Sequence, residues 1–218
     1  MNDINAFFFR KPLEVNFFGH IFAEIYKEGA YTELLEGRKD LTILDIGANV
    51  GITSYYFSQF AKQVYSLEPS SEHFELLSKM VEFNKLTNVK PINKALFTEN
   101  GKFPFGGPLT NRTMRSLHMA TWEDGQPLEE VEATTLEKLF EDEKIDHVDF
   151  MKLDVEGSEQ EICSSEGFRK VAPKIDAILI EKHSWSGRNS HQLDEALKKA
   201  GFKVRTLATD ADIIVCEK

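Results

Sequence analysis

The stretch from Leu41 to Gly51, LTILDIGANVG, constrains the fold more than any other part of the chain. Its apolar residues 41–46 predict a buried strand, and the small residues from Gly47 to Gly51 predict a tight turn. Residues 52–61 then have the apolar spacing of a helix. A strand that passes through a glycine-rich turn into a helix lets the backbone approach a ligand closely and presents free N–H groups to it. The stretch therefore predicts a nucleotide site in an α/β protein.

The spacing of the glycines distinguishes between nucleotides. A dinucleotide fingerprint requires G-x-G-x-x-G, but counting from Gly47 the next two glycines are replaced by Asn49 and Ile52. The chain instead has D-x-G-x-x-x-G, with Asp45 before the turn. This pattern resembles motif I of class I S-adenosylmethionine (SAM) methyltransferases, in which the turn holds the methionine tail and the acidic residue pairs with its ammonium group, usually through water. A tight strand–helix turn in another α/β protein is the alternative.

Length, charge and cysteine count narrow the class of protein. A chain of 218 residues fits one domain with a full core and a small appendage. A net charge of −10 argues against nucleic acid as the main partner, because there is no basic excess to release counterions. The two cysteines are too few for a disulfide framework, and no apolar stretch reaches the roughly 18 residues of a membrane helix. We expect a cytoplasmic protein with neither nucleic acid nor a membrane as its partner.

A second acidic residue follows the next predicted strand, residues 63–68. Glu68 lies at its C-terminal end, 23 residues after the acidic residue of the turn. In an open α/β sheet, ligands bind outside the C-terminal ends of the strands, and a carboxylate there can accept hydrogen bonds from both ribose hydroxyls. A third predicted strand, residues 89–97, would place Asn93 and Ala95 near the adenine.

The rest of the chain alternates between helices and strands. Further strands are predicted at 148–153, 174–181, 202–207 and 212–217, with the last two as a hairpin. Helices are predicted at 71–86 and after capping boxes that start at Thr134, Ser158 and Asn189. This order predicts a mostly parallel sheet with one antiparallel edge region.

Two segments do not follow the alternation. Residues 1–40 are rich in aromatic side chains and predict a helical appendage that packs on the main domain or serves as a lid or subunit contact. Residues 98–130 lack periodicity, and a segment of this length is usually functional or mobile. The segment contains Arg112, Arg115, His118 and Trp122, of which His118 is a weak candidate for a general base. We interpret 98–130 as the acceptor-side wall of the site, in which a short hairpin would fit; an ordinary surface excursion is the alternative.

The corner after residues 148–153 carries the most specific motif, MKLDVEGSE from Met151 to Glu159. Together with LDIGANVGITS and SLEPSSEHFELL, it resembles the FkbM family of SAM-dependent methyltransferases over roughly two-thirds of the chain, Leu41 to His183. The resemblance implies the class I methyltransferase fold, a Rossmann-like seven-stranded sheet ordered 3-2-1-4-5-7-6 with helices on both faces. It also implies methyl transfer from SAM, usually to a hydroxyl of a sugar or small secondary metabolite, with S-adenosylhomocysteine as the product.

The resemblance also implies roles for individual residues. The SAM turn is matched by Asp45, Gly47, Asn49 and Gly51, and the ribose acceptor by Glu68. The region near the adenine is matched by Asn93 and Ala95. The corner that faces the transferred methyl group is matched by Asp154 and Glu156.

A hydroxyl acceptor benefits from a general base as well as from positioning. His183 is the first candidate, because it follows a predicted strand at the C-terminal edge of the sheet and an unperturbed histidine has a pKa near neutrality. Asp154 is the second, as the base or as the group that orients the hydroxyl. A structural His183, hydrogen-bonded at a strand end, is the alternative. A magnesium variant held by Asp154, Glu156, Glu181 and His183 is conceivable, but nothing in the spacing requires it and we assign no metal.

Two other classes of function remain open. One is an NAD-dependent oxidoreductase on a similar sheet, against which the missing glycines argue. The other is a non-catalytic SAM-fold binding protein, against which the intact turn, Glu68 and Asp154 argue. A nucleic-acid methyltransferase is a weaker third option, because the N-P-P-Y type of signature and a basic stripe are both missing from the sequence.

Overall fold

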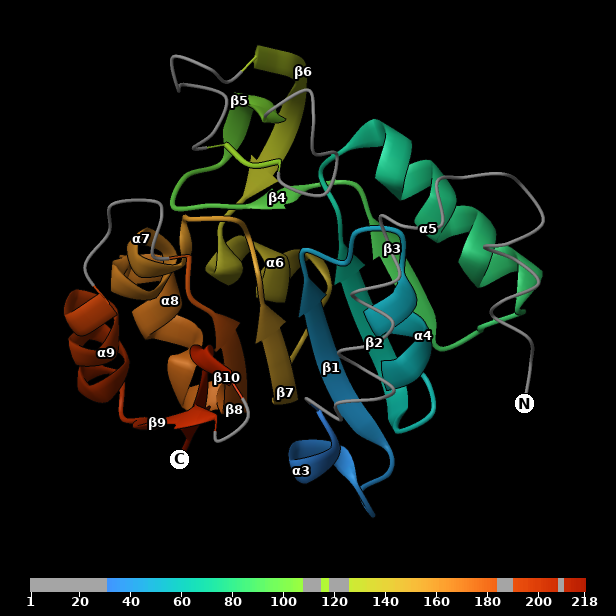
Figure 1. Ribbon diagram of the computed structural model, residues 1–218. Coiled ribbons are helices and arrows are strands. Elements are labelled where there is room, and N and C mark those ends of the chain that lie inside the picture. Colours follow the sequence, from blue (N-terminus) through green and yellow to red (C-terminus); the bar gives the residue numbers. More distant parts are fainter. Residues whose placement is uncertain (1–30, 108–114, 118–125, 184–189, 208–209) are drawn as a thin grey trace.

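A computed structural model of the protein describes residues 31–107, 115–117, 126–183, 190–207 and 210–218. Its centre is a seven-stranded sheet in the order β3-β2-β1-β7-β8-β10-β9 (Figure 1). The strands are β1 (Leu41–Ile46), β2 (Ala61–Leu67), β3 (Val89–Ile92), β7 (Val148–Leu153), β8 (Ile175–Glu181), β9 (Lys203–Leu207) and β10 (Asp210–Glu217). The first five in chain order are parallel, and β10 runs antiparallel to both of its neighbours. Numbered along the chain, this order is 3-2-1-4-5-7-6, so the predicted fold is confirmed.

The middle of the sheet is formed by β1 and β7. All of β1 is buried, and β7 is buried except for a half-buried Asp149. Parallel strands that are covered on both faces have such continuous apolar runs, which is why the sequence predicts them well. Their register pairs Ile43 with Phe150 and Ile46 with Leu153. The turn after β1 and the corner after β7 therefore lie side by side.

Helices cover both faces of the sheet. They are α3 (Thr32–Leu35), α4 (Ile52–Phe57), α5 (Ser71–Phe83), α6 (Leu136–Asp142), α7 (Glu159–Ser164), α8 (Glu166–Val171) and α9 (Ser190–Lys199). One core cluster joins α6 to α9 with the face that carries Leu44 and Met151. The other joins α3 and α4 with the face that carries Ile43 and Phe150, and apolar side chains of α5 pack on the same side. Neighbouring residues of β1 and of β7, such as Ile43 and Leu44, thus serve different cores.

The helix after the glycine turn is shorter than predicted. It ends at Phe57 rather than at residue 61, where β2 already begins. Asn88 gives a physical reason, because its side-chain amide donates to the carbonyl oxygens of Ser58 (2.9 Å) and Ala61 (2.8 Å) and holds the chain in a turn. The buried residues of this helix are Ile52, Thr53, Ser54 and Phe57.

Helix starts also differ from the predicted capping boxes. Helix α6 is capped by Thr135, whose hydroxyl accepts from the backbone N–H of Lys138 at 3.2 Å, one residue later than the predicted Thr134. Ser158 does stand at the N-cap of α7, but its side chain makes no capping hydrogen bond. The predicted cap at Asn189 lies outside the described residues.

The predicted strand 89–97 is wrong in one respect, because it is broken after Ile92. After two intervening residues, Ala95–Leu96 form the short strand β4. This strand belongs to a separate three-stranded sheet in the order β4-β6-β5, with β5 (Gly101–Gly107) and β6 (Gln126–Thr134). We call this the accessory sheet. The break has a cause at Asn93, whose side chain donates to the carbonyl oxygens of Glu68 and Pro69 and turns the chain away.

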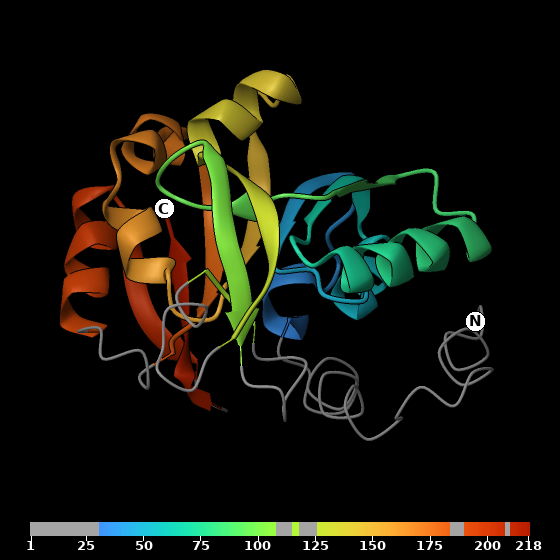
Figure 2. The ribbon, with the colours of Figure 1, turned by 90° about the horizontal axis from the view of Figure 1, so that it is seen from above.

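The accessory sheet lies over the C-terminal ends of the central strands (Figure 1) and across them when seen from above (Figure 2). Its β5–β6 pair is antiparallel and falls largely in the segment interpreted as the acceptor-side wall, although β6 continues to Thr134. Of the predicted N-terminal appendage, residues 1–30 lie outside the described part of the chain. Tyr31, the first described residue, packs its ring 5.0 Å from that of Phe57. Within the described ranges, every helix is too short or too polar to span a membrane.

Candidate active site

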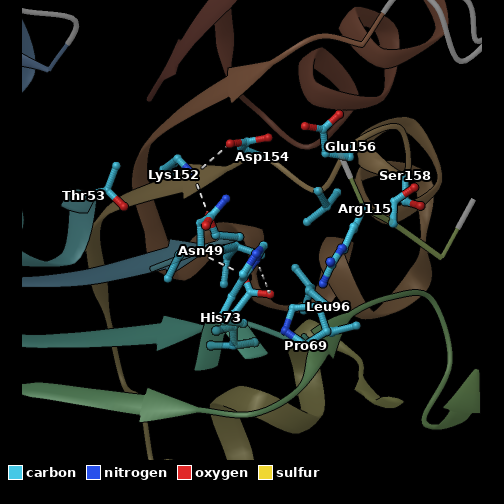
Figure 3. Close-up of a pocket in the computed structure, with 18 of the residues that line it drawn as sticks. Asn49, Thr53, Pro69, His73, Leu96, Arg115, Lys152, Asp154, Glu156 and Ser158 are labelled. Atoms are coloured by element: carbon cyan, nitrogen blue, oxygen red, sulfur yellow. Dashed lines mark hydrogen bonds and ion pairs between the residues drawn. The ribbon is translucent and has the colours of Figure 1, made fainter. Parts of the chain in front are cut away.

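A pocket opens between the accessory sheet and the C-terminal ends of the central strands (Figure 3). The central sheet contributes the turn after β1, Glu68 and Pro69 after β2, the corner after β7 and Glu181 of β8. The accessory side contributes Ala95, Leu96, Phe105 and the segment Arg115–Leu117. The pocket thus lies where an open α/β sheet binds its ligands.

The turn after β1 can be built only with glycine at position 47. Gly47 has φ +78°, and a Cβ atom there would lie 1.8 Å from the backbone oxygen of Asp154. The backbone N–H groups of Gly47 and Ala48 both donate to the Leu67 carbonyl, at 3.1 and 2.9 Å. The first strand end is therefore packed directly against the corner after β7, and the pocket opens above this contact.

Gly51, at the other end of the turn, serves packing rather than the pocket. Its φ is +92°, and a Cβ atom would lie 2.5 Å from Met80 Cε and 2.6 Å from Leu77 Cδ1. Gly51 therefore allows α5 to approach α4. It is not among the described residues that line the pocket, although the sequence resemblance assigns it to the SAM turn.

Asp45 is fully buried below the turn. One carboxylate oxygen accepts hydrogen bonds from Thr53 Oγ1 (2.7 Å) and Ser54 Oγ (2.6 Å), which fasten the start of α4 to β1. The other oxygen has no hydrogen-bond partner among the described residues and lies 3.9 Å from Lys152 Nζ. Burial raises the pKa of Asp45, against the opposing effect of Lys152. Asp45 does not line the pocket as described, so its pairing with a ligand ammonium stays a prediction.

Glu68 faces the pocket with both carboxylate oxygens fixed. Oε2 accepts from the backbone N–H of Asn49 and Oε1 from that of Ser70, each at 2.9 Å. The residue is only 5% exposed, and burial raises the pKa of Glu68 to about 7 in spite of these two hydrogen bonds. A carboxylate has about four acceptor positions, so each oxygen retains one for a ligand hydroxyl.

The two residues predicted near the adenine have different positions. Ala95 lines the pocket from β4. Asn93 instead fastens the loop after β2 through its hydrogen bonds to Glu68 and Pro69, and it is not among the described lining residues. The pocket wall beside Glu68 is completed by the apolar side chains of Pro69 and Leu96.

Lys152 is a site residue that the sequence analysis missed. Its ammonium group, nearly buried below the pocket, donates to the Gly47 carbonyl (2.9 Å) and to Asp154 Oδ2 (3.0 Å). Burial alone would lower the pKa of Lys152, but Asp154 and Asp45 raise it, so the group is a fixed cation. A single lysine inside the apolar strand VDFMKL is the signal that could have identified it.

Asp154, Glu156 and His183 do come together, as predicted residues of one cluster. His183 Nε2 lies 3.2 Å from Glu156 Oε2 and 3.8 Å from Asp154 Oδ1. Both carboxylates line the pocket, whereas His183 is not among the described lining residues. Burial, with the neighbouring charge of Asp154, raises the pKa of Glu156 to about 8, against the opposing effect of His183. Glu156 therefore exchanges its proton near neutral pH.

His183 itself does not have the near-neutral pKa on which its assignment as a base rests. Burial would lower its pKa, but the hydrogen bond and charge of Glu159, followed by the charges of Asp154 and Glu156, raise the pKa of His183 to about 10. The imidazole is therefore a cation at neutral pH and has no free site for a further proton. This property comes from carboxylates on other segments, which the sequence pattern does not place.

Glu159 is the second residue that the sequence analysis missed. Its carboxylate accepts from the backbone N–H groups of Val155 (3.1 Å) and Gly157 (3.1 and 3.2 Å), and one oxygen lies 2.9 Å from His183 Nδ1. A buried carboxylate thus fixes both the corner that carries Glu156 and the histidine beside it. The closing S-E of the MKLDVEGSE motif is its only trace in the sequence.

Two groups of described residues have the donor atoms to hold a metal ion. Asp154, Glu159 and His183 offer ligand atoms within 4.8 Å of one another, as do His147, Asp149 and Asp176 at the N-terminal ends of β7 and β8. In the first group, Glu159 also accepts two backbone N–H groups and one of its oxygens lies 2.9 Å from His183 Nδ1.

This sheet order, with a glycine turn after the first strand and a buried carboxylate after the second, defines the class I methyltransferase fold. A family model described as "Methyltransferase FkbM domain" matches residues 45–204, most of the chain. The chain therefore belongs to the FkbM family of SAM-dependent methyltransferases, as the sequence resemblance indicated. Among curated proteins, no sequence matches the chain significantly.

Solved structures agree with this fold. The methyltransferase FkbM from Methylobacillus flagellatus KT is similar with a TM-score of 0.58 and 15% identity, over 86% of this chain and 46% of that chain. The chain thus spans about half the length of that relative. A putative rRNA-methylase from Clostridium thermocellum has a TM-score of 0.53 and 10% identity, over 89% of this chain and 94% of that chain. At these identities the likeness concerns the fold alone.

Proposed function

We propose that the protein transfers a methyl group from SAM to a hydroxyl of a sugar or small secondary metabolite. The observation that carries the proposal is the geometry of Glu68, whose two oxygens are held by the N–H groups of Asn49 in the glycine turn and of Ser70 after β2. A rigid carboxylate that faces a pocket at this point suits the two hydroxyls of a ribose. Family membership then favours SAM over NAD as the nucleoside.

The residues present fit the parts of SAM. Glu68 would hold the ribose, Pro69, Ala95 and Leu96 would pack against the adenine, and the backbone of Gly47 and Asn49 would face the methionine tail. The carboxylates of Asp154, Glu156 and Glu181 line the same pocket and suit a ligand that carries positive charge. Bound SAM supplies an activated methyl group on a sulfonium centre.

In this proposal Glu156 accepts the proton of the acceptor hydroxyl. It lines the pocket, and its pKa of about 8 is close to the value that a general base needs at physiological pH. The C–O bond to the methyl group forms as the C–S bond breaks, and the hydroxyl proton moves to the Glu156 carboxylate. Asp154, held by Lys152, orients the hydroxyl, and His183 is a positioning residue whose positive charge lowers the pKa of Glu156.

Calorimetric titration with S-adenosylhomocysteine, with NAD in parallel, tests the cofactor. We expect binding of S-adenosylhomocysteine alone, weakened at least about tenfold in Glu68→Ala, because hydrogen bonds to a charged group are lost. Glu130→Ala is the matched control, since Glu130 is exposed on β6 and pairs only loosely with Lys102 at 3.7 Å. Binding of NAD alone would favour an oxidoreductase, and binding of neither would refute the assignment.

A methyl-transfer assay with labelled SAM and a panel of sugars and small hydroxylated metabolites tests the reaction. Transfer to at least one hydroxyl, lost in Glu156→Gln, supports the proposal. Tight binding of S-adenosylhomocysteine without transfer to any acceptor of the panel would instead favour a binding protein.

A further inference from the structure

Arg115 is a cation of the pocket wall that the proposed function leaves without a role. It lines the pocket from the segment between β5 and β6, and its side chain is 11% exposed. One terminal nitrogen donates to Ser70 Oγ at 3.2 Å, and both reach Glu72 Oε2 at 3.3 to 3.4 Å. Its Nε is buried and has no hydrogen-bond partner among the described residues. A buried N–H group without a partner is costly, and it is satisfied when a ligand supplies an acceptor.

The backbone beside Arg115 is held by the accessory sheet. Ser116, 1% exposed, exchanges two backbone hydrogen bonds with Gly106 of β5, at 2.8 and 3.2 Å. Figure 3 shows the Arg115 side chain reaching from this side of the pocket toward Pro69 and Leu96. The guanidinium is therefore fixed from two sides, by a backbone bridge at one end and by Ser70 and Glu72 at the other.

Ser70 connects Arg115 to the proposed ribose position. The Ser70 backbone N–H donates to Glu68 Oε1, and the Ser70 hydroxyl accepts from Arg115. Ser70 thus bridges the guanidinium to the carboxylate that would hold the ribose, and Arg115 lines the same pocket as the apolar residues that would face the adenine. Its positive charge is already paired with Glu72, which makes an anionic group of the acceptor a poorer match.

We propose that Arg115 binds the adenosine half of SAM, an inference that rests on the proposed function. The planar guanidinium packs against the purine ring, as arginine does on aromatic faces, and Nε donates to an acceptor atom of the adenosine. The accessory sheet then serves the cofactor as well as the acceptor. Residues 98–130 are in this respect more than the acceptor-side wall that the sequence pattern suggests.

The test compares S-adenosylhomocysteine with 5′-methylthioadenosine, which has the adenosine but lacks the amino-acid tail. Both are titrated into the wild-type protein and into Arg115→Ala, Arg115→Lys and Glu72→Ala. We expect Arg115→Ala to weaken both ligands by the same factor, about tenfold, as for the loss of a desolvated cation–π contact. Arg115→Lys recovers only part of the affinity, because lysine keeps the charge but not the planar fork.

Glu72→Ala is the matched control for a structural role. It removes the ion pair of Arg115 but leaves the guanidinium in the pocket, so both affinities should remain within about twofold of wild type. Equal losses in Glu72→Ala and Arg115→Ala would overturn the proposal in favour of a structural tie. Unchanged affinities in Arg115→Ala, with a raised KM for the acceptor, would assign Arg115 to the acceptor instead. Failure of the wild-type protein to bind either nucleoside would overturn the proposed function and this inference together.

Discussion

At the scale of single residues, Gly47 has the strictest steric requirement in the site. It combines a positive φ with a backbone oxygen that occupies the place of a side chain. A glycine with a similar φ of +77° stands at position 37, where a Cβ atom would meet nothing within 4 Å. The two positions separate the cost of backbone strain from the cost of the close approach.

Gly47→Ala is expected to lower the free energy of unfolding by more than about 3 kcal/mol, because the Asp154 carbonyl must move to admit the methyl group. Gly37→Ala should cost only about 1 kcal/mol, the strain of the left-handed backbone. Urea unfolding followed by circular dichroism measures both. Equal losses of unfolding free energy in the two variants would show that the Asp154 carbonyl can move at no energetic cost.

If Glu156 is the base, as proposed, the pH dependence of turnover should report its protonation. Since a general base must be ionised, kcat should rise with pH, reach half of its maximum near pH 8 and level off at higher pH, where Glu156 has lost its proton. Glu156→Gln should lower kcat at least about 100-fold and leave the affinity for S-adenosylhomocysteine within about twofold. A flat profile in the wild-type protein would exclude this residue as the base.

His183→Ala tests whether the histidine positions the base or is the base. The variant should still bind S-adenosylhomocysteine, because His183 is not among the described residues that line the pocket. Loss of the imidazolium removes a charge that lowers the pKa of Glu156, so the rise of kcat should move to higher pH. A loss of kcat that no pH restores would indicate a direct role in proton transfer, and an unchanged profile would leave His183 without one.

At the scale of elements, the two serines before α7 and α8 differ in their capping. Ser165 accepts a hydrogen bond from the backbone N–H of Phe168 at 3.1 Å, whereas Ser158 makes no such bond with its side chain. Ser165→Ala should therefore cost about 1 kcal/mol of unfolding free energy, and Ser158→Ala distinctly less. Thermal unfolding of both variants measures the difference, and an equal loss would show that Ser158 caps its helix in solution.

The elements that could be predicted from sequence are the buried parallel strands. For continuous apolar runs such as 41–46 and 148–153, the strand predicted from the sequence and the strand in the structure have the same bounds. The strands of the accessory sheet could not be recognised, because Gly101, Pro104 and Gly106 interrupt the alternation in β5. Proline is tolerated there since β5 is an edge strand.

The residues of the candidate site also fall into those that the sequence predicts and those that it does not. Glu68, Asp154 and Glu156 follow strand ends, a position that the sequence reveals. The roles of Lys152 and Glu159 depend on partners that only the fold brings close, such as the Gly47 carbonyl 105 residues away from Lys152. The pattern of residues along the chain does not predict contacts between residues that are this far apart in the sequence.

At the scale of the whole molecule, cofactor binding should stabilise the fold. S-adenosylhomocysteine at 100 times its Kd should add about 2.7 kcal/mol to the free energy of unfolding, which corresponds to a rise of about 5–10 °C in Tm. Glu68→Ala at the same concentration should lose about half of this shift or more, because a tenfold weaker Kd leaves only about 1.4 kcal/mol of stabilisation, and Glu130→Ala should keep it. Differential scanning calorimetry measures the three proteins, and an equal shift in all three would place the nucleoside away from Glu68.

The chain enters and leaves the accessory sheet at one place. Ala95 and Leu96 of β4 pair with Ala133 and Thr134 of β6, and the Phe97 N–H donates to the Thr134 carbonyl at 2.9 Å. Because the first and last residues of this segment are paired with each other, the residues between them form a closed loop. The entropy cost of closing such a loop changes only slowly with its length, so the loop can be exchanged for a longer or shorter one. Residues 98–132 can therefore vary in length while the turn after β1 and Glu68 keep their geometry, but replacing them would also replace Arg115, the residue proposed to contact the adenosine.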